Sequence, residues 1–370
     1  MRRQVKEFLE GEEFSFGRVA VTDTGSFETA LALLRERKID VVILDVFQGE
    51  TVKGNRAGIR LLEQWRATGF APVILHTALP EGLEEHCNAF VRLVPKEGGN
   101  FARLVKEIEE LFALTIPQIH RAIFDHLETS LRDYMWNFVV DNWTDLHDLA
   151  PRPDFARLLV HRLGLQLARV GVGAVIEQVH PGVTGRDPQE QRVHPAEYYI
   201  KPPVDADPTL GDLRLITRGE HEDLYVIVWP SCDLVYHDGK CKVDRALCAR
   251  ALPIVDFEEY KNWIEKSMPT TGGSATALIE LMSNNRKGRH QAERYHFLPP
   301  VWDIPGVVID FQQLEHVAVD ELRAARCLGT VASPFAESIG ARFVRYLGRL
   351  GTPDLDITLA LDAIRSPSEH

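Results

Sequence analysis

Features that mark secreted and membrane proteins are scarce in this sequence. The 370 residues include only five cysteines, and the first residues, Met1 to Lys6, are too polar to predict a signal peptide. An odd and small number of cysteines argues against a disulfide-built secreted protein and favours reduced thiols in the cytoplasm. No uninterrupted apolar run approaches the ~20 residues that span a bilayer, so a membrane protein is not expected.

Positive charge is also scarce. There are 42 lysine and arginine residues against 54 aspartate and glutamate residues, which gives a formal net charge of −12. Nucleic acid is bound mainly through an excess of positive charge, and the sequence has no helix-turn-helix pattern with a basic recognition helix. General nucleic-acid binding is therefore not expected. Apolar residues make up 45% of the chain, enough for the cores of two or three domains.

Residues 1–115 alternate between helical and strand patterns. Short apolar and β-branched runs predict strands, and apolar residues at three- and four-residue spacing predict helices. This alternation is typical of a parallel sheet covered by helices. The predicted strands are residues 16–22, 41–44, 72–76 and 91–94, and the predicted helices are residues 1–11, 26–36, 58–67, 83–90 and 101–112.

Three polar residues follow three successive predicted strands. Asp45 comes directly after the run Val41 to Leu44, Thr77 ends the next strand, and Lys96 follows the last. Ligands and chemistry in open α/β sheets gather at the carboxyl ends of the strands. We therefore expect Asp45, Thr77 and Lys96 to form the first candidate site. The alternative interpretation is that Asp45 only caps a turn.

This ordered set resembles the receiver domain of two-component response regulators, which has an α/β flavodoxin-like fold. The segments that carry the resemblance are residues 40–45, 72–78 and 93–96. The resemblance implies that Asp45 accepts a phosphoryl group from a sensor histidine kinase, that the Thr77 hydroxyl contacts that group as a switch, and that Lys96 pairs with its charge. A carboxylate is a workable nucleophile, and phosphoryl transfer depends mainly on positioning and charge neutralisation.

The sequence departs from the receiver pattern at its start. Receivers begin with a strand followed by an acidic pair that binds Mg²⁺, and here nothing precedes the first helix. That strand is the middle one in the family order 2-1-3-4-5, so residues 16–22 and 41–44 would have no common neighbour to pair with. One hypothesis is that the natural protein starts upstream of Met1. Of the Mg²⁺ ligands only Asp45 is present, and Mg²⁺ needs near-octahedral oxygen ligation.

Residues 116–205 predict a helical connector and linker. The helical patterns at residues 119–149 and 155–170 are separated by Pro151 and Pro153, which suggests a hairpin and a candidate homodimer interface through residues 119–170. Histidines along these helices are candidate phosphotransfer sites, although no spacing selects one of them. Residues 180–208 are polar and rich in proline and glycine, as expected for a linker.

Residues 206–370 predict an α+β domain. The predicted strands are residues 211–216, 224–229, 249–255 and 307–311, and the predicted helices are residues 256–266, 274–285, 319–327 and 333–349. A stretch of about 45 residues in this domain resembles the small SH3-like barrel of endoribonuclease toxins. No catalytic set accompanies that resemblance.

A cysteine and histidine cluster in this domain has zinc-like composition. Zinc accepts a Cys₃His ligand set, and Cys232, His237, Cys241 and Cys248 provide one, although without the tight Cys-x2-Cys spacing. The alternative is that these are ordinary core cysteines. A further alternative makes Cys232, beside Asp233, a nucleophile with His237 or His296 as its base.

These patterns together predict a cytoplasmic signalling protein with a receiver-like domain and a large C-terminal domain. That order resembles the non-effector receiver component of Detocs-type antiphage two-component systems. The resemblance implies a phosphate sink or tuner that acts beside a separate effector protein. Two alternatives stay open: a response regulator whose C-terminal domain is an enzyme such as a nuclease, and a pseudo-receiver scaffold that docks partners without phosphorylation.

Overall fold

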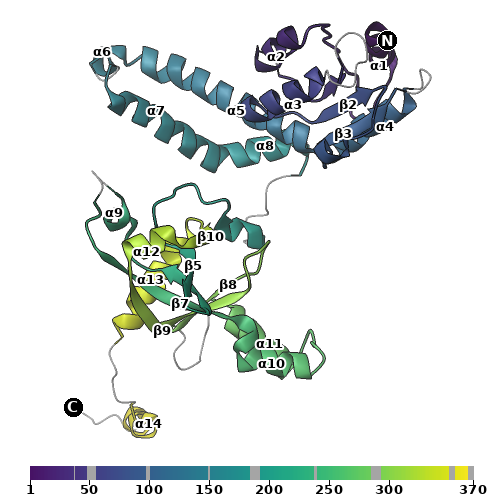
Figure 1. Ribbon diagram of the computed structural model, residues 1–370. Helices are drawn as coiled ribbons and strands as arrows, with labels where there is room; N and C mark the ends of the chain where they lie inside the picture. The colour runs from purple at the N-terminus through teal and green to yellow at the C-terminus, as the bar shows by residue number, and fades with distance from the viewer. Residues whose placement is uncertain are drawn as a thin grey trace. The chain divides into compact units, whose positions relative to one another are not determined.

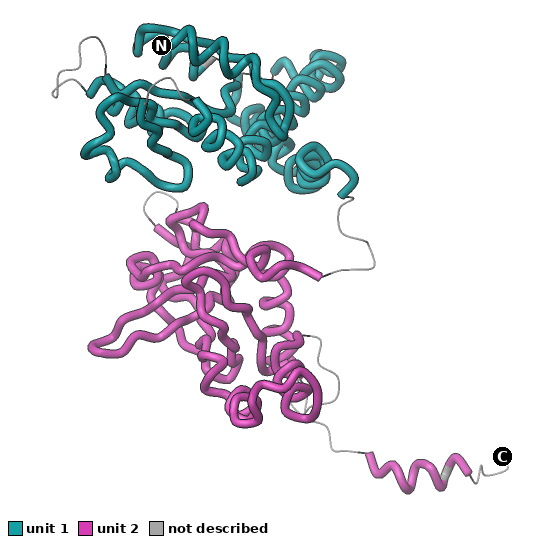
Figure 2. The backbone as a smooth tube through the Cα atoms, turned by 90° about the vertical axis from the view of Figure 1, so that its right-hand side faces the viewer, with its two compact units in different colours: residues 1–190 teal, residues 191–370 magenta. Residues whose placement is uncertain are grey.

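The chain forms two compact units, residues 1–190 and 191–370 (Figure 2). A computed structural model describes residues 1–36, 38–47, 56–96, 101–148, 151–183, 192–236, 240–284, 293–349 and 355–365. The sequence predicts three segments, and the helices of the predicted connector lie in the first unit.

A three-stranded parallel sheet forms the centre of the first unit. Its order is β1-β2-β3, with β1 at Val42–Leu44, β2 at Val73–Thr77 and β3 at Val91–Pro95. β2 is fully buried because helices cover both faces of the sheet, which explains its uninterrupted apolar run. The three strands therefore lie close to their predicted positions.

Helices cover the two faces of this sheet (Figure 1). One apolar cluster joins Val73 and Leu75 to α2 (Phe27–Glu36) and to Leu62 and Trp65 of α3 (Ala57–Thr68). On the other face, Ile74 and Val94 meet α1 (Arg2–Gly11) and α4 (Ala102–Ala113). Ser26 accepts a hydrogen bond from the Thr29 amide at the start of α2, as expected for a helix cap.

The predicted strand at residues 16–22 is wrong. Phe14 and Gly17 form an isolated bridge, and the residues after Gly17 follow no regular pattern. A strand needs a neighbour for its backbone groups, and residues 16–22 pair with none of the three strands in the sheet. The Val21 amide instead donates to a carboxylate oxygen of Glu10, at 3.1 Å. The predicted helix at residues 83–90 is also shorter, a single 3₁₀ turn at Glu84–His86 (η1).

A helical hairpin extends the first unit. It consists of α5 (Ile116–Tyr134), a π-helical segment η2 (Met135–Val140), α6 (Trp143–Leu146), α7 (Pro153–Gln166), a second π-helical segment η3 (Leu167–Gly171) and α8 (Val172–Val179). Arg121 of α5 donates two hydrogen bonds to the Asp40 carboxylate, at 2.7 and 2.6 Å. Lys38 binds Asp125 and Glu128 of the same helix. These ion pairs attach the hairpin to the sheet domain.

A seven-stranded antiparallel sheet forms the second unit. Its order is β4-β10-β5-β6-β7-β9-β8, and the strands are β4 (Tyr199–Ile200), β5 (Asp212–Arg218), β6 (His221–Ile227), β7 (Arg245–Pro253), β8 (Tyr295–Leu298), β9 (Val307–Ala318) and β10 (Arg326–Val331). The chain is therefore an α/β unit followed by an α+β unit. The pairings form a linear series with β4 and β8 at its ends. Among the described strands no pairing closes this sheet into the predicted SH3-like barrel.

Helices cover this second sheet on both faces. α13 (Phe335–Leu347) packs on one apolar cluster, and α9 (Ser231–Leu234) and α12 (Val319–Ala324) pack on another. α10 (Glu258–Glu265) and α11 (Gly273–Met282) pack beside β8, while α14 (Ile357–Arg365) follows α13. The predicted helix at residues 319–327 is wrong at its end, because the chain enters β10 at Arg326. Tyr199 and Ile200, which lie in the predicted linker, form the short strand β4 and pair with β10.

Among the residues that the structure describes, one helix is long and apolar enough to cross a membrane by length and composition alone. It is the continuous helix Pro153–Val179, and 11% of its most apolar 18-residue window is buried. The sequence predicts no such segment because Arg162 and Arg169 interrupt its apolar runs.

Candidate functional site

The predicted site lies at the carboxyl edge of the parallel sheet. Asp45 follows β1, Thr77 is the last residue of β2, and Lys96 follows β3. β1 pairs with β2 and β2 with β3, both in parallel, so the three strands end at the same edge. The fold therefore brings all three predicted residues to one edge of the sheet.

Lys96 and Asp45 are in direct contact. The Lys96 Nζ donates to Asp45 Oδ2 at 2.5 Å, although β2 separates their strands in the sheet. The Lys96 amide also donates to the Thr77 carbonyl at 2.7 Å, which ties the end of β3 to the end of β2. The Asp45 side chain is 48% exposed and that of Lys96 only 15%. The carboxylate is thus open to a reactant while its cation is held in place.

Thr77 supplies a buried hydroxyl to the same edge. The residue is fully buried, and its Oγ1 accepts a hydrogen bond from the Leu79 amide at 3.3 Å. A threonine hydroxyl also has one hydrogen to donate.

Gly58 is a site residue that the sequence analysis missed. A Cβ atom at this position would lie 2.2 Å from the carbonyl oxygen of Asp45 and 2.8 Å from the Cα of Val46. The Gly58 amide donates to the Val46 carbonyl at 3.0 Å, so the start of α3 lies directly against the loop that holds Asp45. Sequence alone signals this only as a glycine at the beginning of a predicted helix.

His76 is a second missed residue. It is 6% exposed, one position before Thr77, and burial lowers the pKa of its imidazole. The Lys96 cation lowers that pKa further, while the Asp45 carboxylate opposes the shift. His76 therefore remains neutral at pH 7 beside the ion pair and adds no second positive charge.

Asp45 is the one Mg²⁺ ligand that the sequence predicts at this edge. In the part of the chain that the structure describes, no group of three or more histidine, cysteine, aspartate or glutamate side chains is arranged to hold a metal ion. The Asp45 carboxylate already contacts an ammonium group. Mg²⁺ needs several oxygen ligands in near-octahedral geometry. In this structure Lys96 is the cation that contacts the Asp45 carboxylate.

The predicted zinc ligands have separate local partners where the structure describes them. Cys232 is exposed with its Sγ 3.7 Å from Asp233, the Cys241 Sγ donates to the Leu234 carbonyl at 3.2 Å, and Cys248 is fully buried in β7. Burial raises the pKa of the Cys248 thiol to about 12, as expected for a cysteine in an apolar core. His237 lies outside the described residues.

His296 is unsuited to act as a general base at neutral pH. It is 2% exposed in β8, and its Nε2 lies 3.3 Å from the Asn284 side-chain nitrogen. Burial, with a smaller contribution from the nearby Arg342 cation, lowers the pKa of His296 to about 3. The imidazole therefore stays neutral across the physiological range, and a base with this pKa would hold a proton only weakly.

This buried histidine predicts that acid destabilises the second unit. The unfolded chain binds a proton with a pKa near 6.5, so stability is constant above that pH and falls as the pH drops from there toward 3. Between pH 7.5 and pH 5 this one group should lower the free energy of unfolding by about 2 kcal/mol. Hydrogen exchange of the β5 and β6 amides at both pH values measures the loss. The variant His296→Gln should show a smaller pH dependence, and an equal dependence in both proteins would contradict the assignment.

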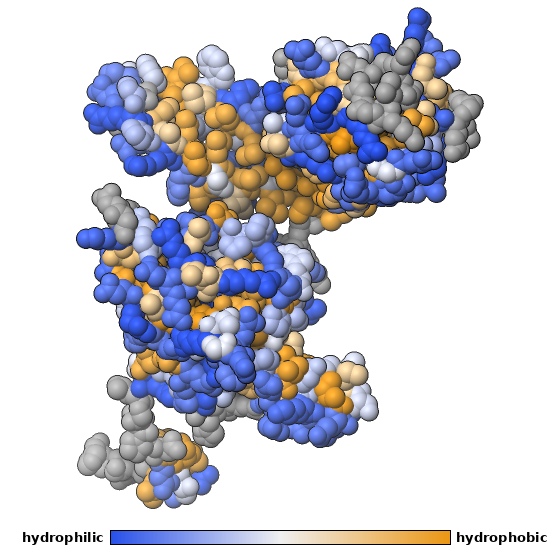
Figure 3. Space-filling view, viewed as in Figure 1, coloured by the Kyte–Doolittle hydropathy of each residue, from blue (hydrophilic) through white to orange (hydrophobic). Residues whose placement is uncertain are grey.

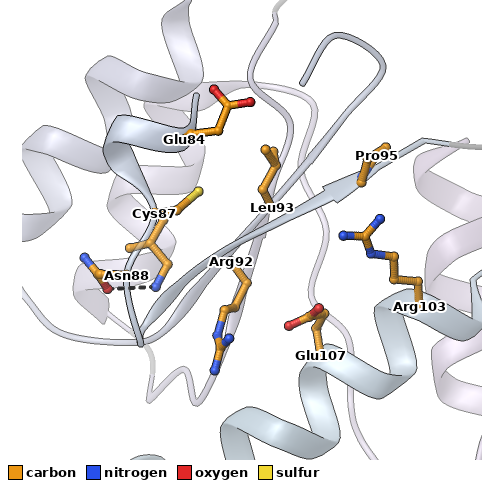
Figure 4. Close-up of a pocket in the computed structure, with 9 residues that line it drawn as sticks. Glu84, Cys87, Asn88, Arg92, Leu93, Pro95, Arg103 and Glu107 are labelled. Carbon is orange, nitrogen blue, oxygen red and sulfur yellow. Dashed lines mark hydrogen bonds between the residues drawn. The ribbon is translucent and has the colours of Figure 1, made fainter. Parts of the chain in front are cut away.

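A pocket of about 440 Å³ lies elsewhere in the first unit (Figure 4). Residues of η1 and the following turn line it on one side, β3 lies between, and Arg103 and Glu107 come from α4. Asp45, Thr77 and Lys96 are not among its lining residues. Burial, with a smaller contribution from Glu84, raises the pKa of the Cys87 thiol in this pocket, so Cys87 is not an activated nucleophile.

No known protein-family profile matches this sequence, and no curated protein matches it. The geometry of the sheet edge is therefore the basis for a functional assignment.

Proposed function

We propose that this protein accepts a phosphoryl group on Asp45 from a partner sensor histidine kinase. The observation that supports this most is the contact between Lys96 Nζ and Asp45 Oδ2 at the carboxyl edge of a parallel sheet. An exposed carboxylate that is held beside a fixed cation has the two properties that phosphoryl transfer needs, a nucleophile and neutralisation of charge.

The proposed step transfers one phosphoryl group. An Asp45 carboxylate oxygen attacks the phosphorus of a phosphohistidine, and the P–N bond breaks as the O–P bond forms. The kinase histidine leaves as a neutral imidazole after it takes up a proton. Lys96 then pairs with the dianionic acyl phosphate, and the Thr77 hydroxyl donates to one of its oxygens.

The wider role rests on the resemblance to receiver domains. We place the protein in the cytoplasm as a two-component regulator or phosphate sink, with an effector protein of the same system as a further partner. A role in antiphage defence follows from the order of its domains alone. The described side chains around Cys232 and His296 give no support to a nuclease activity in the second unit. The strand order of its sheet likewise gives no support to an SH3-like element there.

A scaffold without phosphorylation is the second candidate. Among the described residues, no group of three or more histidine, cysteine, aspartate or glutamate side chains is arranged to hold a metal ion. In that case the Asp45–Lys96 pair would hold the edge in one conformation, and partner binding would be insensitive to phosphoryl donors.

Phosphoryl uptake separates these two functions. The protein is incubated with acetyl phosphate, with and without Mg²⁺, and its intact mass is read. We expect a mass increase of one phosphoryl group in the wild type and none in Asp45→Asn. Asp40→Asn is the matched control, because Asp40 precedes β1 and pairs with Arg121 instead. No uptake in the wild type, or equal uptake in Asp45→Asn, would overturn the proposal.

A further inference from the structure

The helical hairpin leaves large apolar side chains in water. Apolar side chains gather as a band along α5 to α8 (Figure 3). The large apolar side chains of α5 to α8 that are at least 38% exposed are Phe124, Leu131, Trp136, Phe138, Val140, Trp143, Leu158, Val160, Leu165, Val170 and Val172. Two packed helices bury only the stripes that face each other, so the remaining apolar side chains need another surface.

The exposed area is large enough for a stable interface. Trp136, Trp143, Phe124 and Phe138 are 66%, 49%, 54% and 41% exposed. An aromatic side chain has about 150–250 Å² of surface, so these four leave roughly 400 Å² in water. With the seven aliphatic side chains the exposed area approaches the ~800 Å² that each partner contributes to a typical specific interface. Isolated monomers rarely expose an apolar patch of that size.

The two arms of the hairpin carry opposite charge. Residues 116–148, which span α5 to α6, contain six aspartates and glutamates and two arginines. Residues 151–183, which span α7 and α8, contain four arginines, one aspartate and one glutamate. The hairpin is thus complementary in charge to another copy of itself turned so that opposite arms meet.

The two arms do not neutralise each other's charge. Asp125 and Glu128 of α5 pair instead with Lys38 of the sheet domain. Among the described residues, no ion pair joins α5 or α6 to α7 or α8. Arg132 pairs with its neighbour Asp133, and Arg157 pairs with Asp154 of its own helix. The charge difference between the arms therefore remains available to a partner.

We propose that a second copy of this chain covers the hairpin, in a two-fold symmetric dimer in which α5 of one copy lies against α7 of the other. Two-fold symmetry makes each acidic arm meet a basic arm twice, once on each side of the axis. Four helices then enclose one apolar core, as in a four-helix bundle. Exposed tryptophans near the turn of the hairpin become the buried aromatic anchors of the interface.

Complementary charge variants test this dimer with the full-length chain. One variant is Asp141→Lys with Asp145→Lys in the acidic arm, and the other is Arg152→Glu with Arg157→Glu in the basic arm. Sedimentation equilibrium should show a dimer for the wild type. In a dimer of one variant, two-fold symmetry places the reversed charges at both contacts between arms, so like charges face each other twice. Each variant alone should therefore dimerise at least about tenfold more weakly. An equal mixture of the two variants should restore the dimer.

The controls identify what covers the hairpin. The Lys106 side chain is exposed on α4, outside the hairpin, so Lys106→Glu should leave the dimer unchanged. Trp136→Ser with Trp143→Ser should weaken it without changing charge. A monomeric wild type would overturn the proposal, as would two weakened variants that fail to recover on mixing. Sedimentation of a monomeric wild type with vesicles of phosphatidylcholine and phosphatidylglycerol would also overturn it, since a membrane surface would then be the partner.

Discussion

Replacing Arg214 with methionine is expected to lower the free energy of unfolding of the second unit by about 3–5 kcal/mol. Arg214 and Asp212 are 3% and 1% exposed in β5, and Arg214 Nη2 donates to Asp212 Oδ2 at 2.5 Å. The Thr330 hydroxyl and the Thr209 amide complete the hydrogen bonds of that carboxylate. Methionine keeps much of the volume but removes the cation, which leaves a buried carboxylate without its counter-charge.

An exposed pair with the same distance provides the matched control. Arg250 Nη2 lies 2.5 Å from Asp223 Oδ1, but these side chains are 41% and 36% exposed. Arg250→Met should therefore cost at most about 1 kcal/mol. Hydrogen exchange of core amides in β5 and β6 measures both variants in the second unit alone. Similar losses in the two variants would show that burial does not decide the strength of these pairs.

Replacing Gly58 with alanine should destabilise the first unit by about 1–2 kcal/mol and reduce phosphoryl uptake at Asp45. The Cβ atom would meet the Asp45 carbonyl oxygen at 2.2 Å, so either α3 or the loop after β1 must move. Alanine gains about 1 kcal/mol over glycine in a helix, but overpacking of a close backbone contact typically costs more. The clash should therefore outweigh the gain in helix propensity.

Gly11→Ala is the control for this change. Gly11 ends α1, and a Cβ atom there would have no neighbour within 4 Å. It should leave both stability and phosphoryl uptake close to the wild type. Urea unfolding and intact mass after incubation with acetyl phosphate measure the two effects. Wild-type uptake in Gly58→Ala would show that the position of Asp45 does not depend on this contact.

The strands of the first unit could be predicted because helices bury both faces of their sheet. An uninterrupted apolar run such as residues 73–75 is compatible with few structures other than a buried strand. The polar residue after each run marks the edge of the sheet. Thus Asp45, Thr77 and Lys96 could be named from the sequence. Residues 16–22 have the same composition as a strand, but a strand also needs a neighbour, which composition does not reveal.

The missed site residues depend on contacts between distant segments. Gly58 matters because α3 approaches the Asp45 carbonyl, and His76 matters because burial beside Lys96 keeps it neutral. Neither contact has a local sequence signal. In the second unit, composition could not show that Cys248 is fully buried in β7 while Cys232 is exposed.

The most direct test of the account is to find where a transferred phosphoryl group is bound. After incubation with acetyl phosphate, borohydride reduces an aspartyl phosphate to homoserine, and peptide mass mapping then identifies the residue. Phosphoryl transfer to Asp45 predicts homoserine at position 45, with much less in a Lys96→Met variant. A phosphoryl group on a histidine or serine, or no modified residue at all, would contradict the claim that the Asp45–Lys96 edge is a phosphoryl acceptor.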